Sequence, residues 1–195
     1  MEEIFNLQRQ LNVFTLKNIG LDYQHTISHP DKKLVWIENY RKALSAELAE
    51  LVREVEEHGL ETQNGKVEIV DMLHFLVSLS HIVGLEPHQV PTVEASSDGA
   101  TFCACTMRTF LALDDLQSSL KWKWWAKGGG FKPDKARDAV LELWHCFAET
   151  CVLFALDFQT VKRIYMAKNE LNFIRQSRHY NEDTKTEEDN QGLEV

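Results

Sequence analysis

The sequence predicts an all-α protein, a helical bundle with a four-helix core built from two repeated helix pairs, the second of them degenerate. Three observations lead to this fold class. Only four prolines occur in 195 residues, apolar residues recur with a 3.6-residue period, and strand-like alternation is nearly absent. The length suits one domain with enough chain to bury a core. We therefore expect a single all-α domain over residues 1–180 and an acidic flexible tail over residues 181–195.

The individual helices follow from the stretches that lack proline. Their periodicity predicts helices over residues 2–17, 34–58, 66–83, 99–125, 133–156 and 158–178. Pro133 suits the first turn of a helix, because its missing N–H is not needed there. The three glycines at 128–130 predict a flexible break before that helix. Beyond residue 180 the chain is polar and acidic, with too few apolar residues to order itself without a ligand or a partner.

The composition argues against several classes of function. The formal net charge is −9, from 21 Lys plus Arg and 30 Asp plus Glu. A broad nucleic-acid binder or a membrane-surface binder needs a basic face, so we expect neither partner. No apolar run is long enough to span a membrane, and the N-terminus lacks the features of a signal peptide. The four cysteines fit neither a zinc site nor a disulfide framework. We expect a protein that is not secreted and is cytoplasmic, or nuclear in a eukaryote.

Two successive predicted helices each carry two acids one turn apart. Glu47 and Glu50 lie at the border of an apolar seam, on one face of their helix. Glu68 and Asp71 belong to a helix in which eight of the eleven residues 69–79 are apolar. An ionised carboxylate in such surroundings is costly unless it meets a cation. If the two helices pack antiparallel, the four carboxylates converge on one spot.

Converging carboxylates repel one another, and a hard divalent cation relieves that repulsion. Ligation by oxygen alone favours Mg²⁺, Mn²⁺ or Ca²⁺ over Zn²⁺, and Mg²⁺ typically bridges carboxylates to substrate phosphates. The alternatives are a solvated acidic stripe for the first pair and a network of buried salt bridges for all four acids. His74, one turn after Asp71, is a candidate substrate contact or a hydrogen-bonded core residue. Phe75 beside it is expected in the core, with stacking on a base as the alternative.

A second polar stripe lies near the C-terminus. In the segment YMAKNELNFIRQ (165–176) the residues Tyr165, Lys168, Asn172, Arg175 and Gln176 recur every three or four positions. A stripe of Lys, Asn and Arg is suited to phosphate oxygens and sugar hydroxyls. The alternative is a solvated basic face. Four apolar residues, at positions 164, 166, 171 and 174, occupy the opposite side.

Taken together, these segments resemble a known family. ALSAELAELV (43–52), EIVDMLHFLVSL (68–79) and YMAKNELNFIRQ, with LQRQLN (7–12) before them and Tyr180 after them, resemble the dimeric all-α dUTPases of the MazG-like all-α NTP pyrophosphatase superfamily. The resemblance covers residues 7–180. It implies hydrolysis of dUTP, with dUDP as a further candidate, to dUMP and pyrophosphate by a homodimer that requires Mg²⁺, for which Mn²⁺ is expected to substitute.

The resemblance also implies roles for particular residues. Glu47, Glu50, Glu68 and Asp71 match the metal ligands, and Glu47 or Glu50 is expected to orient the attacking water. With the candidates argued above, the expected substrate contacts are Gln8, Asn12, His74, Phe75, Tyr165, Lys168, Asn169, Asn172, Arg175 and Tyr180. The last family motif survives only as Glu188-Asp189-Asn190, without its tryptophan.

The position of the tryptophans departs from the family pattern. The family places a W-x-x-W string soon after E-x-x-E, whereas here the string KWKWW stands at residues 121–125. This position suggests an internal repeat. Glu50, Asp71 and His74 would correspond to Asp115, Glu142 and His145, while Glu47 and Glu68 would correspond to Ala112 and Ala139. We expect this second copy to have lost its metal site.

Two questions stay open from the sequence alone. Trp122, Trp124 and Trp125 either cover the site from the other half or pack in the core or an interface, and we expect packing for at least two of them. The substrate is expected to be dUTP, with another deoxynucleotide such as dCTP as the first alternative. A catalytically inactive helical protein that acts through partner binding is the second.

Overall fold

The structure, a computed structural model, describes residues 1–93 and 100–177. Within these residues the chain forms seven α-helices and one short 3₁₀-helix, and no strand. They are α1 (Glu2–Asn18), α2 (Tyr23–Ser28), α3 (Pro30–His58), α4 (Gln63–Val83), η1 (Pro87–Gln89), α5 (Phe102–Ser119), α6 (Pro133–Leu153) and α7 (Phe158–Ser177). The predicted all-α fold is confirmed. The predicted tail, Tyr180 and the Glu188-Asp189-Asn190 string lie outside the described residues.

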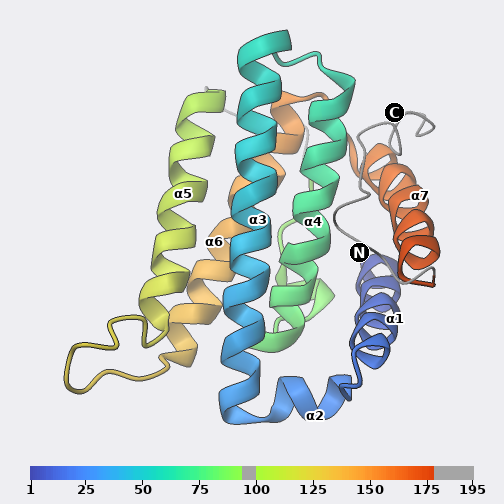
Figure 1. The fold of residues 1–195 in the computed structure, drawn as a ribbon. Coiled ribbons are helices and arrows are strands. Elements are labelled where there is room, and N and C mark those ends of the chain that lie inside the picture. Colours follow the sequence, from blue (N-terminus) through green and yellow to red (C-terminus); the bar gives the residue numbers. More distant parts are fainter. Residues whose placement is uncertain (94–99, 178–195) are drawn as a thin grey trace.

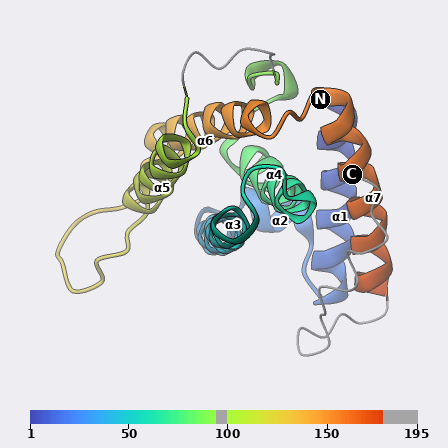
Figure 2. The same cartoon turned by 90° about the horizontal axis from the view of Figure 1, so that it is seen from above.

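Two antiparallel helix pairs build the core of the bundle. α3 pairs with α4 and α5 pairs with α6, and the two pairs pack against each other (Figure 1). α1 and α7 lie side by side and cover the outer side of α4 (Figure 2). Large buried side chains from every layer fill the space between them, among them Ile4, Leu51, Leu73, Leu116 and Trp144. The predicted bundle of two helix pairs is therefore confirmed.

Polar caps set the helix starts, which differ from the prediction. α3 and α4 begin at residues 30 and 63, before the predicted 34 and 66. Pro30 occupies the first turn of α3, and His29 Nδ1 accepts a backbone N–H of that turn at 3.3 Å. Thr62 Oγ1 accepts the N–H of Gly65 at 3.3 Å at the start of α4. The short α2, which was not predicted, is capped by Asp22. Each cap satisfies an N–H that the helix itself leaves without a partner.

The helix predicted over residues 99–125 is shorter than expected, because hydrogen bonds at Ser119 end it there. Ser119 Oγ donates to the carbonyl of Leu116 at 2.6 Å. The carbonyl of Ser119 accepts the N–H of Lys132 at 2.9 Å. These bonds end α5 at Ser119 and close residues 120–132 into a loop that joins α5 to α6.

The three tryptophans of KWKWW therefore lie in a loop rather than on a helix. Trp122 is 40% exposed, Trp124 78% and Trp125 77%. At least two of them therefore do not pack in the core of this chain, whereas packing in an interface stays a prediction. The loop extends from the far side of the core relative to α1 and α7, as both views show (Figures 1 and 2).

The chain turns sharply between α6 and α7. α6 ends at Leu153, before the predicted residue 156, because Ala155 adopts a left-handed φ of 52° and the Leu156 N–H bonds the Cys151 carbonyl at 2.8 Å. In the described part of the chain, no single helix has the length and apolar character needed to cross a membrane. α6 and α7 meet those criteria only as a pair, which is bent by 105°.

Candidate active site

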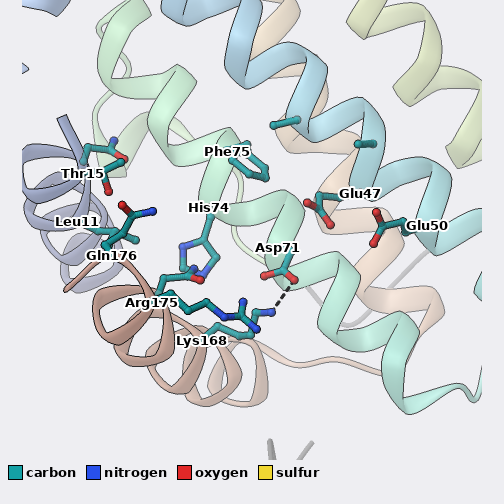
Figure 3. Close-up of a pocket in the computed structure, with 14 residues that line it drawn as sticks. Leu11, Thr15, Glu47, Glu50, Asp71, His74, Phe75, Lys168, Arg175 and Gln176 are labelled. Atoms are coloured by element: carbon teal, nitrogen blue, oxygen red, sulfur yellow. Dashed lines mark ion pairs between the residues drawn. The ribbon is translucent and has the colours of Figure 1, made fainter. Parts of the chain in front are cut away.

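Three of the predicted metal ligands meet between α3 and α4. Glu47 and Glu50 from α3 and Glu68 from α4 each place a carboxylate oxygen within 4.8 Å of the others. Figure 3 shows Glu47, Glu50 and Asp71 turned toward the same space. Asp71 forms an ion pair with Lys168 of α7, with Oδ2 and Nζ 2.7 Å apart. The structure thus gathers three acids in one cluster and holds the fourth, Asp71, against a lysine.

The electrostatics of the cluster show how crowded the negative charge is. Glu68 is 4% exposed, and Asn64 Nδ2 donates to its Oε1 at 3.0 Å. Burial, and then the charges of Asp71, Glu47 and Glu50, raise the pKa of Glu68 from 4.5 to about 8. Without a cation, these surroundings favour the protonated form of Glu68. An all-oxygen set of this kind fits a hard divalent cation, which would replace that proton.

A buried hydrogen-bond network joins α1, α4 and α7 beside the acids. Gln8 Oε1 is 2.7 Å from both the Tyr165 hydroxyl and His74 Nδ1. Gln8 Nε2 donates to Asn12 Oδ1 at 2.9 Å, and Asn12 Nδ2 donates to Ser78 Oγ at 3.0 Å. All five side chains are buried. Since each polar group fixes the next, the network holds its members in one orientation.

This network determines the protonation state of His74. Because Gln8 Oε1 can only accept, the Nδ1 of His74 carries the proton. Burial and the nearby Lys168 lower the pKa of His74 to about 3, so the ring is neutral. It stacks on Tyr165 with ring centroids 4.3 Å apart. Its Nε2 is then an acceptor, and this buried atom has no hydrogen-bond partner among the described residues.

A cavity of about 430 Å³ connects the acidic cluster with this network. Nine of the predicted site residues line it: Asn12, Glu47, Glu50, Asp71, His74, Phe75, Lys168, Asn172 and Arg175. Four more are buried and do not line it, namely Gln8, Glu68, Tyr165 and Asn169. Its volume suits a small molecule. Acids stand on its α3 and α4 side and the cations of α7 stand opposite (Figure 3).

Five lining residues were not among the predicted contacts. They are Leu11, Thr15, Ala43, Ala46 and Gln176. Leu11 and Thr15 neighbour Asn12 along α1, and the two alanines precede the acids on α3. Helical spacing from the predicted residues could have indicated them. The side chains of Leu11, Thr15, Ala43 and Ala46 carried no chemical signal of their own, whereas Gln176 belongs to the polar stripe that the sequence indicates on α7.

A family model described as dUTPase matches residues 1–180. The chain belongs to the all-α dUTPase family. That membership makes it a hydrolase acting on dUTP, a nucleoside triphosphate pyrophosphohydrolase. Neither the curated proteins nor the solved structures yield a match to the chain.

In this dUTPase the polar stripe of α7 faces inward. Tyr165, Lys168 and Asn169 are buried, whereas Met166 and Ile174 are 43% and 41% exposed. The alternative of a solvated basic face is therefore wrong for these buried residues. α7 packs this polar face against α1 and α4, where it completes the cavity.

The second helix pair of the dUTPase lacks the acidic cluster of the first. Two of the four counterpart positions are the buried Ala112 and Ala139. Glu142 pairs with Arg108 at 2.7 Å, and Asp115 pairs with a lysine of α6 at 2.9 Å. These acids are neutralised by basic side chains instead of facing one another. The prediction of a degenerate copy agrees with this arrangement.

Proposed function

We propose that the chain is a Mg²⁺-dependent dUTP diphosphatase that hydrolyses dUTP to dUMP and pyrophosphate. The observation that carries the proposal is the cluster of Glu47, Glu50 and Glu68 within 4.8 Å of one another, beside a cavity that also presents Lys168 and His74. dUDP, which would yield dUMP and phosphate, is a further candidate substrate, and Mn²⁺ is expected to replace Mg²⁺. We place the activity in the cytoplasm, or in the nucleus of a eukaryotic cell.

The acidic residues would hold the metal and the attacking water. Glu47, Glu50 and Glu68 would supply carboxylate oxygens to the metal, and Asp71 would add a fourth carboxylate. Bound Mg²⁺ supplies charge stabilisation to phosphate oxygens and favours attack by water. Glu47 or Glu50, both at the cavity wall, accepts the proton that the attacking water loses.

The α7 side of the cavity would bind the phosphates and the sugar. Lys168 Nζ lies 2.7 Å from Asp71, so a cation already stands next to the acids. Asn172 and Arg175 line the cavity one and two turns further along α7. Charge-assisted hydrogen bonds from Lys168 and Arg175 would offset the negative charge that moves to the leaving pyrophosphate.

The neutral His74 favours uracil over cytosine. Its Nε2 offers a lone pair, and uracil carries an N–H at its N3 position that can donate to it. Cytosine carries a lone pair at N3, so two acceptors would face each other. Gln8 and Tyr165 hold the ring in this state. Asn12 and Phe75 would complete the pocket for base and sugar.

A homodimer is the proposed assembly, as the family resemblance implies. α5 turns Met107, Phe110 and Leu111 to solvent, and they are 62%, 64% and 58% exposed. Residues at this spacing form one apolar stripe, which suits contact with a second subunit. Phe110→Glu should convert a dimer to a monomer in analytical ultracentrifugation. A wild-type protein that sediments as a monomer would contradict the proposal.

The test of the function is hydrolysis of a panel of nucleotides with and without Mg²⁺. We expect dUMP and pyrophosphate from dUTP only with the metal, little product from dCTP, and a loss of activity in Glu50→Gln. Equal hydrolysis of dCTP would refute the base assignment. Undiminished dUTP hydrolysis in Glu50→Gln would refute the role of the cluster. Failure to bind Mg²⁺ in calorimetry, even with a non-hydrolysable nucleotide, would favour an inactive interaction protein.

A further inference from the structure

The loop between α5 and α6 has a charge opposite to that of the whole chain. We call residues 120–132 the Lys–Trp loop. Its sequence LKWKWWAKGGGFK contains four lysines, three tryptophans and no acid, in a chain whose net charge is −9. It projects from the end of the α5–α6 pair, away from α1 and α7 (Figures 1 and 2). The loop is therefore a separate feature from the candidate active site.

The lysines of the loop surround a second cavity. Lys121, Lys123, Lys127 and Lys132 line a space of about 290 Å³ together with Trp122, and no carboxylate lines it. Within the part of the chain that the structure describes, none of these four lysines forms a salt bridge. Gly128 and Gly129 have φ of 71° and 78°, so the chain turns here in a conformation that other residues rarely adopt. A concave site lined by four lysines suits a polyanion.

The tryptophans offer flat apolar faces beside these cations. Trp124 and Trp125 are largely exposed to solvent. Trp122 lies against Trp125 with ring centroids 5.8 Å apart, and Lys123 Nζ lies 5.0 Å from the Trp122 ring centre. Large exposed aromatic surface of this kind marks a site of interaction. The partner must present both negative charge and flat apolar groups.

We propose that the Lys–Trp loop binds single-stranded nucleic acid, whose phosphates contact the lysines and whose bases stack on the tryptophans. Stacking on aromatic side chains next to a basic groove is how unpaired strands are bound without regard to sequence. A duplex hides the faces of its bases. A free nucleotide has one base, whereas two of the three indoles lie outside the cavity. The acidic remainder of the molecule confines such binding to this loop.

Two observations favour a strand over a membrane surface. The four lysines and Trp122 face a concave space, whereas a membrane anchor presents an apolar tip with its cations around the rim. Lysines and tryptophans are also interleaved along the chain, in the string KWKWW at residues 121–125. Phosphates and bases are likewise interleaved along a strand.

The experiment is fluorescence anisotropy of a labelled oligo(dT) of about 20 nucleotides with the full chain. We expect binding whose logarithmic salt slope is about −3, because four phosphate contacts contribute about −0.7 each. Trp124→Ala/Trp125→Ala should weaken binding by roughly 100-fold. Lys121→Gln/Lys123→Gln should reduce the slope to about half. Lys32→Gln/Lys42→Gln on α3 changes the net charge equally and should leave binding unchanged.

Several results would overturn the proposal. They are an absence of binding to oligo(dT), equal binding of a duplex of the same length, and binding that neither loop variant weakens. Competition by dTMP as strong as that of the oligonucleotide would assign the site to a free nucleotide. Binding to phosphatidylcholine–phosphatidylserine vesicles in place of the oligonucleotide would assign it to membranes. The tryptophan variant should also keep its full dUTP hydrolysis, and a loss would show that the loop serves the active site.

Discussion

Replacing Glu68 by glutamine should stabilise the protein without metal and remove most of its response to Mg²⁺. Burial and three neighbouring acids raise the pKa of Glu68 from 4.5 to about 8. The folded protein must therefore take up a proton that the unfolded chain has released, and this uptake lowers the free energy of unfolding at neutral pH. Glutamine has the same shape and can still accept from Asn64, yet it carries no charge.

The size of the effect follows from the pKa difference. Each tenfold change in proton affinity corresponds to about 1.4 kcal/mol, so at pH 7 the variant gains up to about 3 kcal/mol. For a chain of this size that is a rise in Tm of roughly 6–12 °C. The sign of the linkage also predicts a pH dependence. Because the pKa of Glu68 is higher in the folded protein, its contribution to the free energy of unfolding is fully present below pH 4.5. That contribution is lost as the pH rises through about 8. At pH 5 the two proteins should differ by less than about 1 kcal/mol.

The assay is thermal denaturation of wild type and Glu68→Gln with and without Mg²⁺. Mg²⁺ at about 100 times its Kd should stabilise wild type by about 2.7 kcal/mol and the variant by much less. Glu170→Gln, a change at an exposed acid of α7, is the control and should behave as wild type. A variant that is less stable at pH 7 without metal, or that keeps the full Mg²⁺ response, would refute the reasoning.

Three further predictions concern the same cavity. Lys168→Met should destabilise the metal-free protein by about 3 kcal/mol, because it removes the cation that lies 2.7 Å from Asp71 beside the acids. Mg²⁺ should restore part of the loss in urea denaturation, and equal stability of the variant and wild type would contradict the ion pair. Tyr165→Phe removes the hydroxyl that donates to Gln8, so it should lower the free energy of unfolding by about 1–2 kcal/mol. It should also weaken nucleotide binding in calorimetry, and unchanged binding would argue against the network. Because the pKa of His74 is lowered in the folded protein, the free energy of unfolding should fall as the pH drops from 6.5 toward about 3. His74→Asn should flatten that part of the curve of stability against pH. A curve that keeps its slope would show that another group titrates there.

The acidic half of the site could be predicted because helical spacing is local. Residues three or four apart share a face whatever the rest of the chain does, so Glu47 with Glu50 and Glu68 with Asp71 follow from the sequence once both segments are helices. The apolar surroundings of Asp71 also predicted that it needs a cation. The sequence did not predict that Lys168 of α7 pairs with Asp71, because this contact depends on how α7 packs against α4.

The direction of α7 and the end of α5 depended on tertiary structure in the same way. No feature of the sequence shows whether the polar stripe of α7 faces inward or toward solvent. The packing of α7 against α1 and α4 decides this. α5 ends at Ser119 because Lys132 returns to its carbonyl, a bond between residues that the sequence separates by a loop. The exposure of Trp124 and Trp125 follows from that ending, and helical periodicity predicted a longer helix instead.

The most direct test of the account compares one carboxylate in each helix pair during dUTP hydrolysis. Asp71 lies at the cavity with Glu47 and Glu50, whereas its counterpart Glu142 is held by Arg108. With Mg²⁺ present, Asp71→Asn should lower the rate of dUMP and pyrophosphate formation by at least about 100-fold, and Glu142→Gln should leave it near that of wild type. Equal rates in both variants, or a loss confined to Glu142→Gln, would contradict the assignment of the active site to α3 and α4.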